Sequence, residues 1–519
     1  MKKRLIALFL SSLLLVSVLS GCGDNKATEE AGFGSDGTSS SGEPVTGGEL
    51  VVGIAQDLGD SLDPYQMTAA GTREVLFNVY EGLVKPDATG EFIPAVASDY
   101  SVSEDGLTYT FPLREGVTFH NGAPVTAEDV LYSYETCAAS TGEDALAAAL
   151  SSVSSVDVDE AGAVVITLTE AMPDFLSYVS MVHISPKDYP DQAKSPVGTG
   201  PFKFVSRSAQ ESLVLEKFPE YWGDAAYLDK VTFKIFEDAN ALMSALNAGT
   251  VDMAGHLTID QVSSVDPNAF NTLEGTMNLV QALYLNHDKE PFNNEQVRQA
   301  MCYAIDVDGI LDLTCDGHGK KIGSSIYPAF TKYFDESLAS TYTYDVEKAK
   351  SMLAEAGYPD GFSMTITVPS NYTPHMNVAE VLVEQLAQVG ITATIEPVEW
   401  ETWLADVYAG RNFEGTVIGF DAATLSAGAL LDRWQSDNES NMINYNNPEY
   451  DKVMQEASTC TDEAKQTELY KQAAKILADT AANVYIQDLA DFVLLKKGLE
   501  GYEFYPLYVM DLSTVHQVG

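Results

Sequence analysis

Aromatic and acidic side chains gather in two short stretches in the second half of the sequence. The first holds Trp400 and Trp403, and the second holds Phe420 followed by Asp421. Aromatic rings offer large rigid faces that grip a solute without demanding one kind of side chain from it, and a carboxylate can pair with a cation. This chemistry suits reversible binding. The alternative, that the rings belong to a core, stays open for Trp400 and Phe420 and is favoured for Trp403.

Catalytic and metal-binding motifs are missing from the sequence. It contains no G-x-S-x-G and no H-E-x-x-H, and residues 317–320 (Gly-His-Gly-Lys) lack the first glycine of a phosphate-binding loop. The 7 histidines form no H-x-H or i, i+4 pair. A pair of carboxylates at glycosidase spacing would arise by coincidence among 76 acids. We therefore expect no enzyme activity, no bound metal and no cofactor.

The charge balance and the cysteines narrow the class of protein further. The chain has 76 acidic residues against 29 basic ones, a formal net charge of −47. Such a surface repels polyphosphate, so nucleic acid is not expected as a partner. The cysteines form no C-x-x-C. Cys302 and Cys315 are near enough in sequence to pair, but Cys302 lies in a helical pattern where a buried free thiol is common, and both alternatives stay open.

The elements that would position the aromatic residues alternate between helix and strand. Asp345 can cap a helix that ends before Gly357, and residues 362–368 follow as a strand. A second helical stripe stops at Gly390, and residues 391–395 alternate as the next strand. This alternation predicts an α/β fold with mixed, largely parallel sheets flanked by helices. Because ligands bind beyond the carboxyl ends of such strands, we expect the site in the loops that carry Trp400 and Phe420.

The most specific sequence motifs lie in residues 80–135. This stretch opens with Y-E-G-L and continues with I-P-A-V-A, S-E-D-G-L-T-Y-T-F, L-R-E-G-V-T-F-H-N-G and V-T-A-E-D-V. Further runs are V-G-T-G-P-F at residues 197–202 and P-F-N-N-E-Q-V-R-Q-A at residues 291–300. In order and wording these runs resemble solute-binding protein family 5, the peptide- and nickel-type receptors of bacterial ABC importers. The resemblance implies a two-lobed, periplasmic-binding-protein-like fold of type II, whose hinged lobes close on a solute.

The resemblance also implies site residues. In the family a loop of S-L-D-P wording lies at the mouth of the cleft, which makes Asp57 and Leu58 candidate neighbours of the solute. The tryptophan and the Gly-aromatic pair that line the family's solute pocket match Trp400 and Gly419-Phe420.

One departure from the family bears on the solute. Peptide-binding members continue after the Gly-aromatic pair with D-x-x-D-P, whose aspartate pairs with the α-ammonium of the peptide. Here residues 421–428 contain a single acid, Asp421, and it is not at the matching place. A buried ammonium without a partner is costly. Either Asp421 or Asp57 therefore supplies the charge from another angle, or the solute carries no amine.

The N-terminus reads as an export signal and a lipid anchor. Residues 2–4 are Lys-Lys-Arg, and residues 5–18 form an apolar run that is shorter than the roughly 20 residues of a membrane-spanning helix. Leu19-Ser20-Gly21-Cys22 matches the lipobox of bacterial lipoproteins, so we expect residues 1–21 to be removed and Cys22 to carry the lipid. Residues 22–48 are poor in large apolar side chains and are expected to form a flexible tether outside the cytoplasm.

These observations combine into one functional expectation. We expect lobe I over residues 49–283 and 486–519, with a subdomain around residues 97–210, and lobe II over residues 284–485. The expected protein is a monomeric, lipid-anchored receptor that delivers a small solute, a short peptide in the first instance, to the permease and ATPase subunits of an ABC importer. The alternative is the same receptor for an oligosaccharide, an opine-like compound or a metal complex. An extracellular hydrolase is a remote third possibility.

Overall fold

The computed structural model describes residues 42–519, except residues 68, 141–144 and 423. The expected signal peptide, the lipidated Cys22 and most of the tether lie outside these residues. Residues Glu43–Gly519 form one compact unit. The last residues of the expected tether take part in it, because β1 (Pro44–Val45) pairs antiparallel with β22 (His516–Val518).

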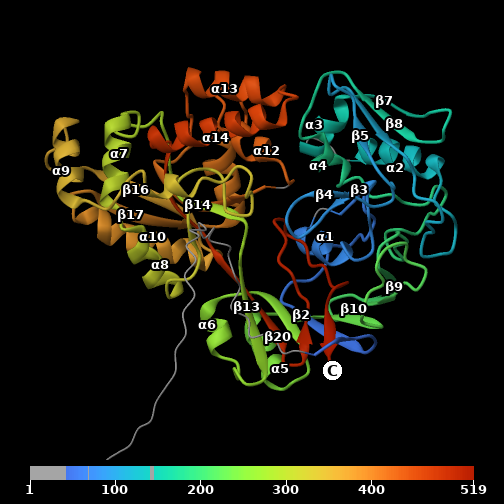
Figure 1. The fold of residues 1–519 in the computed structure, drawn as a ribbon. Helices are drawn as coiled ribbons and strands as arrows, with labels where there is room; N and C mark the ends of the chain where they lie inside the picture. Colours follow the sequence, from blue (N-terminus) through green and yellow to red (C-terminus); the bar gives the residue numbers. More distant parts are fainter. Residues whose placement is uncertain (1–41, 68, 141–144, 423) are drawn as a thin grey trace, which may run out of the picture. The chain divides into compact units, whose positions relative to one another are not determined.

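The first large sheet has seven strands in the order β13-β20-β12-β2-β11-β10-β9 (Figure 1). Its centre is β2 (Glu49–Ile54), which pairs in parallel with β11 (Lys230–Ile235) and with β12 (Met253–Leu257). The remaining members are β9 (Phe202–Ser208), β10 (Ser212–Lys217), β13 (Phe270–Thr276) and β20 (Ala490–Lys496). In the sequence, three helices lie between strands of this sheet: α1 (Ala70–Leu76), α5 (Ala239–Asn247) and α6 (Ile259–Ser263).

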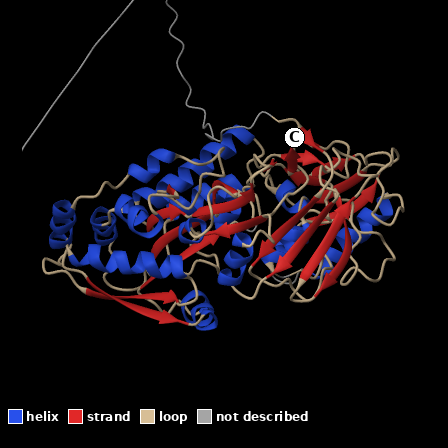
Figure 2. Ribbon diagram, turned by 90° about the horizontal axis from the view of Figure 1, so that it is seen from below, coloured by secondary structure: helices blue, strands red, loops and turns tan. Residues whose placement is uncertain are grey.

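The second large sheet has six strands in the order β15-β19-β14-β18-β16-β17. β16 (Ser363–Pro369) runs parallel to β17 (Thr392–Val398) and β18 (Gly415–Asp421), whereas β14 (Leu279–Leu285) runs antiparallel to β18 and to β19 (Asn483–Asp488). The edge strand is β15 (Lys320–Lys321). Figure 2 shows strands flanked by helices, and the mixed α/β character predicted from the sequence is confirmed. The prediction of largely parallel sheets is wrong: in the two large sheets, parallel pairing is confined to β2 with β11 and β12 and to β16 with β17 and β18, and the other pairings are antiparallel.

Helices bury both faces of this second sheet. Successive residues of β14 belong to different cores: Ala282 and Tyr284 to one, Leu283 and Leu285 to the other. This alternation follows from the two-residue period of a strand. The helices of the region are α7 (Glu295–Ala304), α8 (Val307–Cys315), α9 (Val346–Glu355), α10 (Thr373–Ala387), α11 (Trp400–Thr402), α12 (Ala427–Asp432), α13 (Pro448–Ser458) and α14 (Glu463–Asp479), with a 3-10 turn at Glu336–Ser340 and a π-helical turn at Trp403–Ala409.

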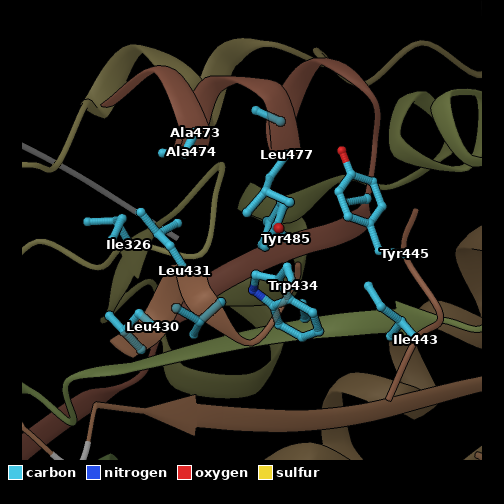
Figure 3. Packing of buried hydrophobic residues seen from close by; sticks show 14 of the residues in the cluster. Ile326, Leu430, Leu431, Trp434, Ile443, Tyr445, Ala473, Ala474, Leu477 and Tyr485 are labelled. Carbon is cyan, nitrogen blue, oxygen red and sulfur yellow. The ribbon is translucent and has the colours of Figure 1, made fainter. Parts of the chain in front are cut away.

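Figure 3 shows the larger of these two cores, where Leu477 of α14, Tyr485 of β19 and Trp434 lie together. Leu431 of α12 and Ile443 complete its centre. All of these side chains are at most 7% exposed, as expected for a closely packed core.

A four-stranded sheet in the order β5-β6-β8-β7 lies within residues 97–210, where a subdomain is expected, although β9 at the end of that range belongs to the first large sheet. It consists of β5 (Ser101–Val102), β6 (Thr108–Phe111), β8 (Val164–Leu168) and β7 (Val153–Val158), and it is accompanied by α2 (Ala127–Ser140), α3 (Ala145–Ser151) and α4 (Phe175–Val179). Two small sheets remain: β3 (Val84–Pro86) with β4 (Phe92–Pro94), and β1 with β22 and β21 (Leu499–Glu500).

Helix starts follow the capping residues of the sequence. The backbone N–H of Thr126 donates to Asp129 Oδ2 at 2.9 Å, and Asn294 Oδ1 accepts from Gln296 N at 3.0 Å. Asp345 Oδ1 accepts from Lys348 N at 2.9 Å. Each such cap is worth about 1 kcal/mol. Cys302 and Cys315 are both free thiols.

The chain passes between the two large sheets twice. Met277 and Asn278 join β13 to β14, and Leu489 joins β19 to β20. The two passages are tied together, since Met277 N donates to Leu489 O at 2.8 Å and Leu279 N donates to Asp488 Oδ1 at 3.0 Å. The boundaries expected at residues 283/284 and 485/486 fall inside β14 and β19, whose residues all belong to the second sheet.

Candidate functional site

A cavity of about 160 Å³ lies where the chain passes between the two sheets, and we call it the crossing cavity. Its walls come from residues 276–279, from Gly419 and Asp421 at the end of β18, and from the C-terminal segment. That segment contributes the rings of Tyr502, Phe504, Tyr505 and Tyr508, and the first sheet contributes His256 and Asp491. A space of this size holds one side-chain-sized group rather than a whole peptide, since cavities of about 150 Å³ accommodate benzene.

His256 joins two buried acids beside this cavity. Its Nε2 lies 2.7 Å from Glu74 Oε1, and its Nδ1 lies 3.1 Å from Asp491 Oδ2. The ring also stacks on Tyr508, with centroids 4.5 Å apart. Burial by itself would lower the pKa of His256, but the two carboxylates outweigh it and hold that pKa well above its ordinary value. His256 is therefore an imidazolium at neutral pH, fixed in place on both nitrogens.

A further buried acid, Asp488, sits at the second passage between the sheets. Burial raises the pKa of Asp488 to about 7, although the hydrogen bonds from the backbone of Leu279 and the side chain of Thr276 work in the opposite direction. Oδ2 of Asp488 and Oδ1 of Asp491 are both buried and have no hydrogen-bond partner within the described part of the chain. Such oxygens are costly to leave unsatisfied.

A second, larger cavity of about 540 Å³ lies beside the four-stranded sheet. It is lined by residues of that subdomain and by residues 329–333 and 460–463. At its edge Asp174 Oδ2 accepts hydrogen bonds from Ser426 Oγ at 2.6 Å and from Tyr470 Oη at 3.0 Å. Burial raises the pKa of Asp174. This acid thus ties the N-terminus of α4 to α12 and α14.

Arg433, directly after α12, presents a cation to an aromatic wall. Its guanidinium carbon lies 4.1 Å from the ring centroid of Phe420 and 5.7 Å from that of Trp434. Arg433 Nε and Nη1 are buried without a hydrogen-bond partner among the residues described here, and the same holds for Trp434 Nε1 and Tyr327 Oη. Trp434 and Tyr327 belong to the larger core, so of these three residues Arg433 alone has a partly exposed side chain.

Among the described residues, no three His, Cys, Asp or Glu side chains form a set that could hold a metal ion. Within the same residues there is also no helix with the length and apolarity needed to cross a bilayer.

Comparison with known proteins identifies the family. Residues 91–442 match the model of the bacterial extracellular solute-binding proteins, family 5, middle region. The chain belongs to family 5. Proteins of this family are extracellular solute-binding proteins, and the fold is that of the type II periplasmic binding proteins.

The family 5 relatives of this chain are named for different solutes. The chain is 27% identical to the oligopeptide-binding protein AppA of Bacillus subtilis (strain 168), over 98% of this chain and 97% of AppA. It is 30% identical to heme-binding protein A of Haemophilus influenzae, over 82% of this chain and 84% of that protein. The solved structure of DppA from Helicobacter pylori in complex with the peptide STSA has a TM-score of 0.73 and 28% identity, covering 92% of this chain and 99% of DppA.

The family 5 residues expected at the site occupy different places in the structure. The six candidates are Asp57, Leu58, Trp400, Trp403, Phe420 and Asp421. Of these six, Asp421 lines the crossing cavity. Phe420 points to the opposite face of β18, where it meets Tyr284 edge to face at 5.1 Å and packs against the larger core. This division follows from strand alternation, which puts Gly419 and Asp421 on one side and Phe420 on the other.

The two tryptophans stack on each other, with centroids 5.2 Å apart and ring planes 7° apart. Trp403 is 1% exposed and its Nε1 donates to Thr416 Oγ1 at 3.0 Å, so its burial supports the core alternative. Trp400 is half-buried and also touches Tyr372, at 5.3 Å between centroids. Neither ring lines the crossing cavity.

Asp57 and Leu58 lie next to Arg207. Asp57 Oδ1 accepts from Leu58 N at 2.7 Å and is 3.8 Å from Arg207 Nη2, while Leu58 packs in the core of the first sheet. Neither lines the crossing cavity.

Sequence reasoning missed the residues of the crossing cavity other than Gly419 and Asp421. His256 carries no local signal, because its partners Glu74 and Asp491 come from distant parts of the chain. The clustering of four aromatic residues within positions 502–508 was the one available sign.

Proposed function

We propose that this family 5 chain is the receptor of an ABC importer, that it captures short peptides and that it passes them to a membrane permease and its ATPase. The observation that carries the proposal is the crossing cavity. It combines carboxylates and four aromatic rings at the place where the chain passes twice between its two large sheets. Small-molecule sites of this kind pair mostly apolar walls with a few fixed polar groups.

The geometry suggests how capture would work. A solute at the carboxyl end of β18 would touch residues of both sheets, so binding would favour an arrangement in which they are held together. Two short passages of one to two residues are suited to act as a hinge, because hinges are a few element-terminal positions. Exclusion of water then strengthens each polar contact.

The protein would be a monomer that a lipid anchors to a membrane. Cys22, in the lipobox of the sequence, would carry the lipid that holds a monomeric receptor at the outer face of the membrane. The chain would bind one solute and release it unchanged, without catalysis.

A non-peptide solute is the second candidate. It is favoured by the lack of D-x-x-D-P in residues 421–428 and by the 30% identity to heme-binding protein A of Haemophilus influenzae. The two candidate functions use the same receptor fold and differ in the chemistry of the solute.

Binding measurements on the purified full-length chain separate the candidates. Mass spectrometry of the native protein first identifies any co-purifying solute, and titration calorimetry then compares di- to hexapeptides with an oligosaccharide panel. We expect a stoichiometry of one peptide per chain, and recovery of the peptide intact after overnight incubation. Binding of saccharides alone would favour the second candidate, and cleaved peptide would refute a purely binding role.

A further inference from the structure

We propose that Asp174 holds the four-stranded sheet and its helices, the subdomain, against the helices that cover the second large sheet, and that it does so before any solute has bound. We call Asp174 and its partners Ser426 and Tyr470, together with Gly428, the latch. The inference rests on the proposed function only in taking these two parts of the chain to move relative to each other. It adds a contact that favours the closed arrangement without involving the solute.

The carboxylate of Asp174 reaches across the boundary between the two parts. Asp174 precedes α4, where an aspartate ordinarily accepts a hydrogen bond from its own helix, yet its side chain makes no such cap. Its Oδ2 accepts instead from Ser426 Oγ at 2.6 Å and from Tyr470 Oη at 3.0 Å. Figure 1 shows α4 on one side of this boundary and α12 and α14 on the other. Because hydroxyls that donate to a carboxylate form short, strong bonds, this one side chain joins two distant parts of the sequence.

Gly428 leaves free the space that this carboxylate fills. A Cβ atom on Gly428 would lie 2.7 Å from Asp174 Oδ2 and 2.6 Å from Tyr470 Oη, closer than a carbon atom can approach either oxygen. The residue lies in α12, where alanine is the favoured residue and the backbone has no need of a glycine. A side chain at this position and the closed contact therefore exclude each other.

The boundary around the latch has the character of one between parts that separate. The second cavity, of about 540 Å³, opens beside Asp174 and is lined from both parts. Interfaces that stay closed are packed without voids of this size. Among the described residues that line it, Glu91 and Glu104 on the subdomain and Glu463 on the opposite side stand against a single cation, Lys332. This excess of like charge opposes closure, so the hydrogen bonds of the latch must offset it.

A thiol of the chain itself reports whether the two parts are closed. Cys460 lines the second cavity and is half-buried, whereas Cys137 of α2 is buried in the core of the subdomain. A maleimide that carries a long polyethylene-glycol chain is too large to enter the cavity, so it modifies Cys460 only after the parts separate. The rate of modification then tracks the population of the open form.

The experiment uses full-length protein whose native mass spectrum shows no bound solute, and peptide mapping assigns each modified cysteine. In Asp174→Ala and in Gly428→Ala we expect Cys460 to react about tenfold faster or more, the factor for losing one hydrogen bond to a charged group. The rate at Cys137 should change less than about twofold, because the subdomain itself stays folded. Tyr470→Phe loses one of the two bonds, so it should have a smaller effect than Asp174→Ala and add nothing to it in the double variant.

Matched controls separate the latch from general effects of substitution. Asp157→Ala removes an exposed acid from β7 of the same subdomain. Gly71→Ala adds a methyl group to a glycine of α1 whose Cβ would meet nothing closer than 3.9 Å. Both variants should react like the wild type.

The outcomes separate this inference from the proposed function. Wild-type rates at Cys460 in both Asp174→Ala and Gly428→Ala would overturn the latch while the receptor function stands. A parallel rise at Cys137 would also overturn it, because the substitutions would then unfold the subdomain instead of opening the boundary. The receptor function fails on a different measurement, the absence of binding to any peptide or saccharide by the wild type.

Discussion

At the scale of single residues, two stacked tryptophans show why residue type alone does not assign a role. Trp400 and Trp403 are three positions apart and their rings lie nearly parallel, yet Trp403 is 1% exposed and Trp400 is half-buried. The difference arises because Trp403 faces β18 and bonds Thr416, whereas Trp400 covers it from outside and leaves part of its ring free. One ring is available to a solute and the other is not.

This contrast predicts different effects of the two alanine variants. Trp403→Ala should lower the free energy of unfolding by about 3–5 kcal/mol, the usual cost of emptying a buried aromatic site. Trp400→Ala should cost about 1 kcal/mol, since part of its surface is already exposed. It should weaken binding several-fold for a solute long enough to reach beyond the crossing cavity, which this ring does not line. Urea unfolding and calorimetry on both variants measure this. Similar stability losses in the two variants would contradict the assignment of Trp403 to the core.

At the scale of elements, the sequence predicts what is decided locally. The caps at Thr126, Asn294 and Asp345 are present, and the strands expected at residues 362–368 and 391–395 appear as β16 and β17. The α/β fold follows from that alternation. The crossing cavity does not, because its walls come from five separated parts of the chain and no periodicity connects them.

Strand alternation could have carried the site prediction one step further. In β18 the odd positions Gly419 and Asp421 face the crossing cavity, and the even positions Ile418 and Phe420 face the larger core. A ligand prediction for both Phe420 and Asp421 therefore implies contacts on two faces of one strand. No sequence pattern shows which of these two faces of β18 borders a cavity.

Arg298 shows how one side chain fastens an element. It lies in α7 and donates to three backbone oxygens: Phe292 O at 2.8 Å, Ala481 O at 2.9 Å and Thr480 O at 3.1 Å. The last two belong to the segment between α14 and β19. The arginine thus fixes the packing of α7 against this segment.

Replacing this arginine should therefore affect stability and leave binding intact. Arg298→Met keeps the length of the side chain but leaves three carbonyl oxygens without their donor, which we expect to cost about 2–4 kcal/mol. Gln299→Ala, next in the chain, loses two exposed bonds, to Asp479 O and to Glu295 Oε1, and should cost about 1 kcal/mol. Thermal unfolding gives both values. A loss of solute affinity in Arg298→Met at a temperature where the variant is folded would place Arg298 at the site instead.

At the scale of the whole molecule, the proposed anchor predicts where the protein is found in the cell. Cys22→Ala removes the thiol that would carry the lipid, so the variant should be released from membranes or stay uncleaved. Fractionation and intact mass measure this, and Cys460→Ala, which removes a free thiol of the folded unit, should remain anchored. Normal anchoring of Cys22→Ala would refute the lipobox interpretation.

The buried acids at the passages between the sheets also give the whole molecule a characteristic response to pH. Burial raises the pKa of Asp488 from 3.8 to about 7. Between these values the folded protein holds a proton that the unfolded chain has lost, so the free energy of unfolding falls as the pH rises through this window and levels off above it. His256 acts in the same direction at higher pH, because its raised pKa gives a stabilisation that is complete below about 6.5 and is lost as the pH rises through the folded value.

Asp488→Asn isolates the contribution of the carboxyl group, since it keeps the shape of the side chain and cannot ionise. Relative to the wild type, the variant should gain about 3 kcal/mol of unfolding free energy between pH 5 and pH 8, from the roughly two pKa units between pH 5 and the folded pKa at 1.36 kcal/mol each. The contribution of His256 is common to both proteins and cancels in the difference. Urea unfolding at the two pH values measures this gain, with the exposed Asp437→Asn as the control that should show none. Parallel pH profiles for wild type and Asp488→Asn would mean that Asp488 is ionised in the folded protein, and that the passage between the sheets admits water.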